Sequence, residues 1–426
     1  MNESKYAVGL DIGTDMVKVV VGHTAGRGSA AGEGSVTAAN PNQVTVIGVG
    51  THENGGMRKG TVVNLDKTAE AVDRALEAAE RMSGYQIDRA AVSINGSHIV
   101  GFSSRGVIAV GAGSQTIGHE ELTRVEEAAT VVQLPANREI LDVTPRSYKL
   151  DAQDNIRDPF GMTGVRLEVD AYMITALAPH LKNVEKVLDM TELPPSRIVV
   201  SGLAAARVGL NEQQRENGVV LIDIGGTTTN VDVYEEGDIV HAAVLPVGSN
   251  NITNDLAIGL KTDLNIAEKV KIEHAVAAPE LRRGSSATVS VKVGGRELSF
   301  DSAIVDEVVE ARLAEIFELV NKELKKVKKQ ANLPGGAVLT GGGAKLRGIA
   351  DYAREVLGMN AMVAKIDGFD GMKEQVSDPS FAAALGLMMI DLDLAGSGGS
   401  HKKKRGSLFA NAGAGFSKLF AGPKKK

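Results

Sequence analysis

The sequence contains no cysteine, and none of its apolar runs approaches the ~18 residues that a membrane-spanning helix requires. The absence of cysteine excludes disulfide scaffolds, zinc sites with thiolate ligands and cysteine nucleophiles. The chain has 8 histidines and no His-Glu-x-x-His motif, which argues against a metalloprotease. The first residues, MNESKYAVGLDIG, lack the charged and apolar regions of a signal peptide, so we expect a cytoplasmic protein.

The composition is otherwise that of a folded soluble protein. Of 426 residues, 43% are hydrophobic and 23% are charged, both close to the averages of globular proteins. These values exclude a disordered, collagenous or fibrous chain. At ~150 residues per domain, the length predicts two to four globular units.

The charges are distributed unevenly. The whole chain carries a net charge of −6, but residues 401–426 contain eight Lys and Arg residues and no acidic residue, which leaves −14 on the rest. Phosphate contacts require clustered basic residues. The acidic body therefore argues against nucleic acid as a partner.

Two segments of the chain share one pattern. Residues 6–22 (YAVGLDIGTDMVKVVVG) and 219–234 (VVLIDIGGTTTNVDVY) each contain a β-branched run, Asp-Ile-Gly, small and hydroxyl residues, and a second β-branched run. Such runs around glycine predict a β-hairpin. Asp11 and Asp223 lie 212 residues apart, so the pattern predicts a tandem duplication of one α/β module. A third glycine-rich turn lies in residues 337–348.

Helical and strand patterns fill the segments around these hairpins. Apolar residues recur at helical spacing in 66–83, 119–134 and 301–330, whereas 90–110 and 139–150 have the character of strands. The strand–helix–strand order of 90–150 predicts an insertion within the first half of the chain.

The three glycine turns predict a nucleotide site. Glycine exposes backbone N–H groups and threonine adds hydroxyls, which together suit a phosphate chain. Asp11 and Asp223 occupy equivalent turns, where their carboxylates could hold a hydrated Mg²⁺. One such turn is equally consistent with an ordinary β-turn, but two hairpins and a late Gly-Gly-Gly turn in this order are far more specific.

The chain resembles the actin-like ATPase superfamily and, within it, the FtsA family of bacterial cell-division proteins. The runs that carry the closer resemblance are 138–170, 246–275 and 378–388. The resemblance implies an α/β, actin-like (ribonuclease H-like) duplicated two-lobe fold with an inserted 1C-type subdomain in the first lobe. It implies subdomain 1A at 1–84 and 163–203, 1C at 85–162, 2A at 204–249 and 336–392, 2B at 250–335, a flexible linker at 393–406 and a tail at 407–426.

The resemblance also assigns the site residues and the cofactors ATP and Mg²⁺. It implies a first phosphate hairpin at Asp11, Gly13 and Thr14, a second at Asp223, Gly225, Gly226, Thr227 and Thr228, and an adenosine turn at Gly341, Gly342, Gly343 and Lys345. Glu268 and Lys271 fall where relatives line the adenine and ribose pocket. Their i, i+3 spacing fits a solvated ion pair as well.

Two departures from the family pattern affect hydrolysis. Relatives read Gly-Gly-Gly-Thr-Thr-Asp at the second hairpin, whereas this chain has Thr227 in place of a glycine and Asn230 in place of the carboxylate. Relatives also carry a glutamate that orients the attacking water where this chain has Ser201. A hydroxyl is a poor proton acceptor. We therefore expect ATP to bind well and to be hydrolysed slowly or barely.

The end of the chain predicts a membrane-binding helix. At ~100° per residue, Leu408, Phe409, Phe416, Leu419 and Phe420 fall within one arc of ~120°, and Lys418 lies opposite them. An apolar face flanked by lysine clusters suits an anionic lipid surface. A helix docked on the body and a merely solvated tail are the alternatives.

The resemblance implies a function in cell division. It implies a protein that self-associates into filaments and tethers FtsZ filaments to the cytoplasmic face of the cell membrane at the division site. The C-terminal peptide of FtsZ would dock on 250–335, where the basic residues are Lys261, Lys269, Lys271, Arg282 and Arg283. Subdomain 1C would bind other divisome proteins. A PilM-like pilus-assembly adaptor and a sugar kinase are the alternative functions.

Overall fold

The computed structural model describes residues 6–24, 44–111, 116–278 and 287–396, which fall into two compact units. Unit 1 is built from the described residues of Met1–His98 and His180–Ala395, and unit 2 from those of Ile99–Pro179. Unit 1 contains both predicted hairpins and is described first.

The first sheet of unit 1 has the strand order β11-β6-β1-β2-β3-β19. The strands are β1 (Tyr6–Ile12), β2 (Met16–Thr24), β3 (Val44–Glu53), β6 (Ala90–Ile94), β11 (Pro195–Val200) and β19 (Phe369–Gly371). Strands β1 and β2 form the predicted antiparallel hairpin, and β6 joins β1 in parallel. A small antiparallel pair, β4 (Met57–Arg58) and β5 (Thr61–Val62), follows β3.

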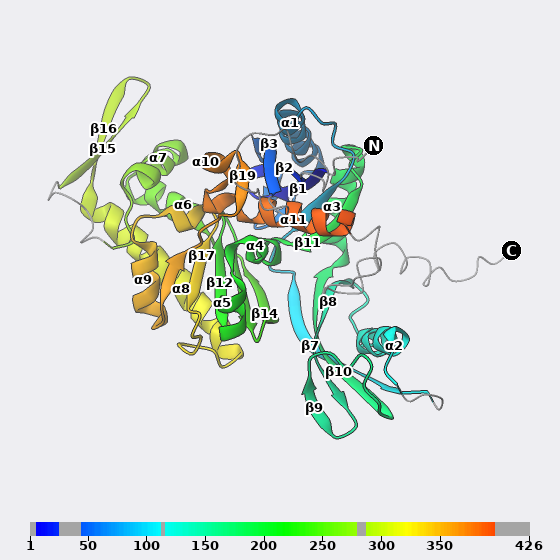
Figure 1. Cartoon of the computed structure of the whole chain (residues 1–426). Helices are drawn as coiled ribbons and strands as arrows, with labels where there is room; N and C mark the ends of the chain where they lie inside the picture. The colour runs from blue at the N-terminus through cyan, green and yellow to red at the C-terminus, as the bar shows by residue number, and fades with distance from the viewer. Residues whose placement is uncertain (1–5, 25–43, 112–115, 279–286, 397–426) are drawn as a thin grey trace, which may run out of the picture. The chain divides into compact units, whose positions relative to one another are not determined.

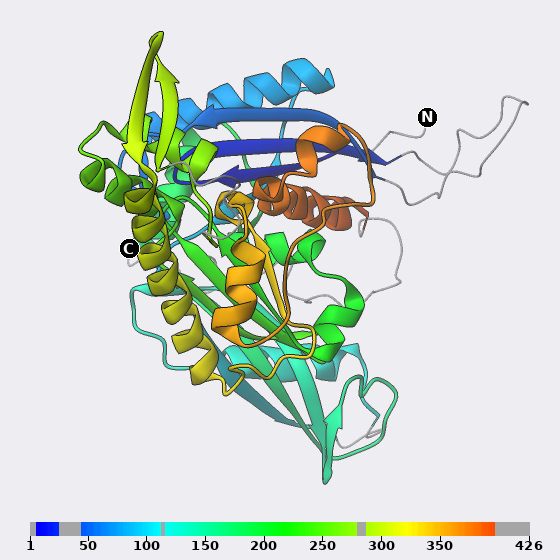
Figure 2. The same ribbon diagram turned by 90° about the vertical axis from the view of Figure 1, so that its left-hand side faces the viewer.

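Helices α1 (Leu65–Ser83) and α11 (Ala382–Gly396) lie on opposite sides of this sheet, as Figures 1 and 2 show. Close packing requires glycine in the strands: a Cβ at Gly50 would lie 1.9 Å from the Ala75 carbonyl of α1, and a Cβ at Gly9 would lie 2.0 Å from the Ala384 carbonyl of α11. Helix α1 corresponds to the predicted helix 66–83, which is confirmed.

The second sheet of unit 1 repeats this arrangement, with the order β18-β17-β12-β13-β14. Its strands are β12 (Val219–Ile224), β13 (Thr229–Glu235), β14 (Asp238–Leu245), β17 (Ala337–Thr340) and β18 (Ala361–Val363). Strands β12 and β13 form the second predicted hairpin, and β17 joins β12 in parallel as β6 joins β1. The predicted duplication of one α/β module is therefore confirmed.

Helices cover the second sheet. They are α6 (Ser249–Gly259), α7 (Leu264–His274), α8 (Ser302–Lys326) and α9 (Ile349–Leu357), and a ribbon of β15 (Thr288–Val293) and β16 (Arg296–Asp301) precedes α8 (Figure 2). Helix α8 buries an apolar stripe at helical spacing that includes Val309, Leu313 and Phe317. Asp301 caps it by accepting a hydrogen bond from the Ala303 amide. The predicted helix 301–330 thus extends to Lys326.

Unit 1 contains four further described helices and two short 3₁₀ turns. They are α3 (Ala178–Met190), which begins at the end of unit 2, α4 (Ser201–Gly209), α5 (Glu212–Asn217) and α10 (Lys373–Val376), with 3₁₀ turns at Gly342–Lys345 and Pro379–Phe381.

Unit 2 is an antiparallel sheet with one helix. The strand order is β7-β10-β8-β9, formed by β7 (Val100–Ala109), β8 (Arg138–Leu150), β9 (Gln153–Ile156) and β10 (Arg166–Leu177), and α2 (His119–Thr130) packs on one face. The predicted helix 119–134 ends at Thr130, four residues before the predicted end. Pro135 disfavours a helical backbone at Leu134, the residue that precedes it. Unit 2 overlaps the predicted inserted subdomain, 85–162, but also contains β10, which pairs with β7 and β8.

Candidate functional site

The first turn, residues 13–15, joins β1 to β2. The Gly13 amide donates to the Met16 carbonyl (3.1 Å), and a Cβ at Gly13 would lie 2.6 Å from the same oxygen. The Asn54 side chain donates to the Gly13 carbonyl (2.8 Å). Strand register places Asp11 of β1 directly opposite Lys18 of β2. The turn is thus tightly fixed beside a carboxylate and an ammonium group.

The second turn, residues 225–228, joins β12 to β13. The Gly225 amide donates to the Thr228 carbonyl (2.8 Å), which closes the turn as in the first hairpin. Register places Asp223 opposite Asn230, and the Asn230 side-chain amide donates to the Asp223 carboxylate (3.0 Å). The amide that replaces the family's carboxylate therefore contacts one of the two predicted metal ligands.

The two turns contact each other within unit 1. The Thr227 hydroxyl donates to the Thr14 hydroxyl (2.9 Å), and the Asn95 amide donates to the Thr228 hydroxyl (3.3 Å). The structure therefore brings the predicted phosphate hairpins together although they lie more than 200 residues apart in the sequence.

Asp11 and Asp223 share one electrostatic environment. Burial raises the pKa of the Asp11 carboxyl, while the nearby charge of Lys18 and a hydrogen bond with Ser93 lower it. Burial and, next, the charge of Asp11 raise the pKa of Asp223 to about 6, against the hydrogen bond from Asn230 and the charge of Lys18. Two carboxylates that repel each other across a site are the arrangement that a bound divalent cation would relieve.

The third turn, residues 341–345, follows β17 and lies against the second hairpin. Gly341 has a φ of 82°, and a Cβ there would lie 2.4 Å from the Asp223 carboxylate. Gly343 packs on Ile224, whereas Gly342 faces open space. The Lys345 ammonium pairs with Asp378 (2.5 Å). Gly341 thus lets the third turn approach Asp223 closely, and the space beside Gly342 is unfilled.

Glu268 and Lys271 form the ion pair that their spacing allowed. Their charged atoms lie 2.7 Å apart on α7, and Lys271 also donates to the Thr253 hydroxyl (2.8 Å). The Lys271 side chain is only 11% exposed and that of Glu268 is 41% exposed, so the pair is half-buried and not fully solvated. Both charges act on Asp15 of the first turn, which places the pair near the predicted phosphate site.

The sequence analysis did not identify Lys18, Asp15 and Asn250 as site residues. Lys18 was recognisable in principle, because a hairpin centred on residues 13–15 pairs it with Asp11. Asn250 stands in the first turn of α6, and its side chain donates to the Asp15 carboxylate (2.7 Å). No local pattern predicts this contact, since the two residues lie 235 positions apart. Ser201 begins α4 and is buried.

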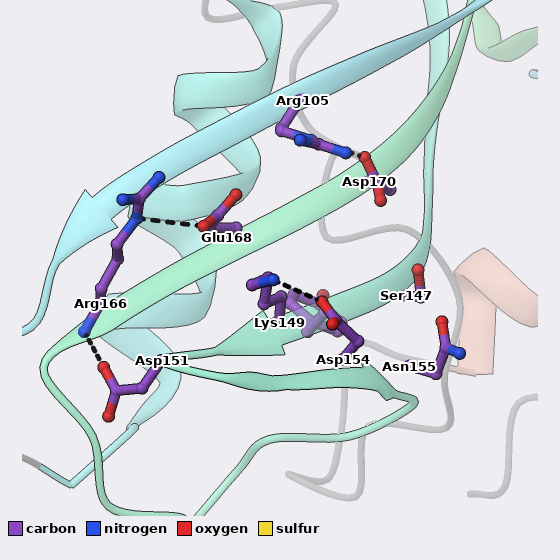
Figure 3. Close-up of a pocket in the computed structure, with 10 residues that line it drawn as sticks. Arg105, Ser147, Lys149, Asp151, Asp154, Asn155, Arg166, Glu168 and Asp170 are labelled. Carbon is purple, nitrogen blue, oxygen red and sulfur yellow. Dashed lines mark hydrogen bonds and ion pairs between the residues drawn. The ribbon is translucent and has the colours of Figure 1, made fainter.

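A hollow of about 370 Å³ on unit 2 is a second candidate site (Figure 3). Its basic side chains are each paired with an acidic neighbour: Arg105 with Asp170, Lys149 with Asp154, and Arg166 with Glu168. Asp151 accepts the Arg166 backbone amide (2.9 Å). The charges of this surface are satisfied within unit 2, so it is a poorer phosphate site than the glycine turns.

Several predicted residues lie outside the described part of the chain. They are the tail residues Leu408, Phe409, Phe416, Lys418, Leu419 and Phe420, and the basic residues Arg282 and Arg283. Within the described residues, no helix is both long and apolar enough to cross a bilayer, and no group of three or more His, Asp or Glu side chains is arranged to hold a metal ion.

Two family models match the chain. The model described as "Cell division protein FtsA" matches residues 220–386, and "SHS2 domain inserted in FTSA" matches residues 96–175. The cell division protein FtsA of Pseudomonas aeruginosa is 35% identical over 92% of this chain and 90% of its own length. That of Bacillus subtilis is 35% identical over 92% of this chain and 84% of its own length.

Solved structures confirm the actin-like fold. The PilM–PilN type IV pilus biogenesis complex matches with a TM-score of 0.63 at 18% identity, covering 91% of this chain and 98% of that one. MreB5 of Spiroplasma citri, solved with ADP, matches with a TM-score of 0.53 at 14% identity over 92% and 98% of the two chains. These likenesses establish the fold, and the sequence matches over nine-tenths of the length establish the relationship: the chain belongs to the FtsA family of cell-division proteins.

Proposed function

We propose that this FtsA-family protein binds ATP and Mg²⁺ between the first and second turns of unit 1 and uses the bound state to form filaments on the membrane. The observation that carries the proposal is the meeting of Asp11, Lys18 and Asp223 beside two glycine–threonine turns that contact each other. MreB5 of Spiroplasma citri, which shares the fold, was solved with bound ADP, and this supports a nucleotide as the ligand.

The residues at the site fit the expected ligands. Asp11 and Asp223 supply the hard oxygen atoms that Mg²⁺ takes through its water shell. The backbone N–H groups and hydroxyls of residues 13–14 and 225–228 would bind the phosphates, and residues 341–343, Glu268 and Lys271 would line the adenosine pocket. Lys345, held by Asp378, would support the third turn. The metal would neutralise phosphate charge.

We propose that hydrolysis is weak. Ser201 supplies a hydroxyl where relatives have a glutamate, and Asn230 supplies an amide where they have a carboxylate. Neither group accepts a proton readily near pH 7. ADP release at a rate comparable with that of a metabolic kinase would contradict this assignment.

The tail pattern at 407–426 supports attachment to anionic lipid. One short helix binds marginally, but many tails on one filament bind with avidity because later contacts are intramolecular. We further propose that subdomain 1C, predicted at 85–162, is the contact for other divisome proteins; the compact unit of the structure is Ile99–Pro179, because β6 pairs with β1 in unit 1 and β10 pairs with β7 and β8 in unit 2.

Helices α6 and α7 support a peptide-binding surface on 250–335. Ile258, Leu264 and Ile272 are 77%, 56% and 72% exposed there, Lys269 lies on α7, and Lys261 lies in the turn between the two helices. Exposed apolar side chains near Lys269 of α7 and Lys261 of the turn before it suit a peptide with apolar and acidic residues, as the C-terminal peptide of FtsZ is expected to be. Lys271 is not available for this contact because it is buried in its ion pair.

Reconstitution on anionic vesicles tests the adaptor function. We expect the full chain with ATP to bind the vesicles and to recruit an FtsZ tail peptide, and a version ending at Ser400 to remain in solution. Phe409→Glu and Phe416→Glu should each weaken sedimentation with vesicles, whereas Asp189→Asn on α3 should not. Equal binding by the shortened version would locate the anchor elsewhere.

The alternative functions are less well supported. A pilus-assembly adaptor shares the fold, but at 18% identity PilM supports the fold alone, whereas sequence matches name FtsA. A sugar kinase needs a carboxylate base in the cleft, and the positions considered for that role hold Ser201 and Asn230.

A further inference from the structure

Asp15 is the last residue of the first turn, and the proposed binding of ATP and Mg²⁺ assigns it no role. Its carboxylate reaches the second hairpin and α6. One oxygen accepts a hydrogen bond from the Asn250 amide (2.7 Å), and the other would lie 1.9 Å from a Cβ at position 226. Gly226 is therefore the residue that leaves room for this carboxylate.

The position of Asp15 is fixed from both sides. The Asn54 backbone amide donates to the Asp15 carbonyl (2.7 Å), which holds the backbone of the first turn. Asn250 is itself held in place, because its backbone N–H donates a hydrogen bond to the Gly226 carbonyl (2.7 Å). The carboxylate thus stands at a defined place beside the second turn, although the residue as a whole is exposed to solvent.

The charged groups around Asp15 come from three elements. Lys271 and Glu268 of α7 and Lys18 of β2 act on it, with Lys271 and Lys18 favouring the ionised form and Glu268 opposing it. Partial burial raises the pKa of Asp15, and the hydrogen bond from Asn250 lowers it. The two lysines are each engaged elsewhere, Lys271 with Glu268 and Lys18 with the Ser380 carbonyl (2.7 Å).

We propose that Asp15 is a selectivity residue whose carboxylate, fixed by Asn250 next to the second turn, opposes polyphosphates and so limits the affinity for ATP without affecting adenosine. This inference rests on the proposed nucleotide site. A negative charge held within the phosphate-binding region repels each phosphate of an incoming nucleotide, and the repulsion is stronger at a partly buried carboxylate than in bulk water. Because adenosine carries no charge, its binding does not experience this repulsion.

Two substitutions separate the charge from its positioning. Asp15→Asn removes the charge and retains a side-chain oxygen that can accept from Asn250. Asn250→Ala retains the charge but releases it from its fixed place, so the carboxylate can turn toward water. Asp189→Asn, at an exposed acid on α3, is the matched control for a change in net charge.

Equilibrium titration of the full chain with ATP and Mg²⁺, and separately with adenosine, tests the proposal. We expect Asp15→Asn to bind ATP about three- to tenfold more tightly at low salt, Asn250→Ala to show a smaller gain, and Asp189→Asn to match the parent. The gain should shrink in 0.5 M salt, where the Debye length falls to a few ångströms. Adenosine affinity should be unchanged in all four proteins.

Other results would overturn the proposal in distinguishable ways. Weaker binding of ATP with Mg²⁺ by Asp15→Asn would make Asp15 a metal ligand, and unchanged binding would show that its charge does not reach the phosphates. An equal gain for adenosine would show a steric effect. If the parent chain binds neither ligand, the proposed function itself fails; if the parent binds ATP and the variants do not differ, only this inference fails. Should Asp15→Asn not fold, Asn250→Ala carries the test.

Discussion

The first and second hairpins have nearly the same backbone but different residues across from their aspartates. Asp11 faces Lys18, whereas Asp223 faces Asn230. Both partners favour the ionised carboxylate, Lys18 by its charge and Asn230 by a hydrogen bond, against burial, which raises the pKa of both aspartates and brings that of Asp223 to about 6. Strand register therefore sets which group opposes the effect of burial on each aspartate, a charge at Asp11 and a hydrogen bond at Asp223.

The largest effect is expected at Gly341, where an added Cβ would meet the second hairpin. Gly341→Ala forces a Cβ against the Asp223 carboxylate at a φ of 82° and should lower the free energy of unfolding by about 2–4 kcal/mol. Gly342→Ala, next to it and facing open space, is the control and should change it by less than about 0.5 kcal/mol. Chemical denaturation measures both. Equal losses would mean that the third turn does not press on Asp223.

The next effect concerns the charge of Asp223. Asp223→Asn removes a carboxylate that burial and Asp11 make costly to ionise, so at pH 7.5 the free energy of unfolding should rise by about 1–3 kcal/mol. ATP affinity in the presence of Mg²⁺ should fall at least about tenfold, because a metal-binding oxygen is lost. Asp11→Asn should produce the smaller gain in stability. A loss of stability in Asp223→Asn would contradict the comparison.

The raised pKa of Asp223 predicts that the free energy of unfolding depends on pH. Between its ordinary pKa of 3.8 and about 6, Asp223 holds a proton in the folded protein that the unfolded chain releases. This contribution to stability is therefore complete below pH 3.8 and is lost as the pH rises to about 6. Affinity for Mg²⁺ with ATP should change in the opposite direction and increase through the same range. Asp223→Asn should remove both slopes, as unfolding and binding titrations from pH 4.5 to 8 would reveal.

A smaller effect is expected from restoring the carboxylate of the family. Asn230→Asp replaces a hydrogen-bond donor to Asp223 with a third negative charge in a buried position, 1% exposed. Without ligand, this should lower the free energy of unfolding by about 1–2 kcal/mol and raise the pKa of Asp223 further. Thermal unfolding in the presence and absence of Mg²⁺ with ATP measures the cost. A more stable variant without ligand would show that Asn230 does not support Asp223.

We expect the smallest effect on stability from a disulfide that joins the first and second turns. The hydroxyls of Thr14 and Thr227 lie 2.9 Å apart, so cysteines at both positions should form a disulfide on mild oxidation. Because the native chain has no cysteine, a mobility shift without reductant is unambiguous. The single variants Thr14→Cys and Thr227→Cys are the controls. Failure of the double variant to crosslink would contradict the contact between the hairpins.

Sequence analysis predicted the hairpins because each is local and strongly patterned. Asp-Ile-Gly between β-branched runs specifies a turn with its own closing hydrogen bond, and α1 and α8 follow equally clear helical periodicity. The end of α2 was wrong because residues 131–134 continue the apolar pattern without continuing the helix. The Asp15–Asn250 contact was not predictable, since it depends on how two distant segments pack in three dimensions.

The candidate site could likewise be predicted where it depends on local sequence pattern, and not where it depends on packing between distant segments. Glycines and aspartates of the turns follow from the pattern and the family resemblance, whereas the half-buried state of Lys271 follows only from the packing of Thr253 against α7. Lys18 lies between these cases, because the hairpin register that places it opposite Asp11 can be counted in the sequence.

A crystal structure of the chain with a non-hydrolysed ATP analogue and Mg²⁺ would show directly whether a nucleotide binds at the glycine turns. We expect density for the phosphates between residues 13–14 and 225–228, with the adenosine against residues 341–343. A nucleotide found instead in the charged hollow of unit 2, or none beside the glycine turns at saturating concentration, would contradict the proposed site.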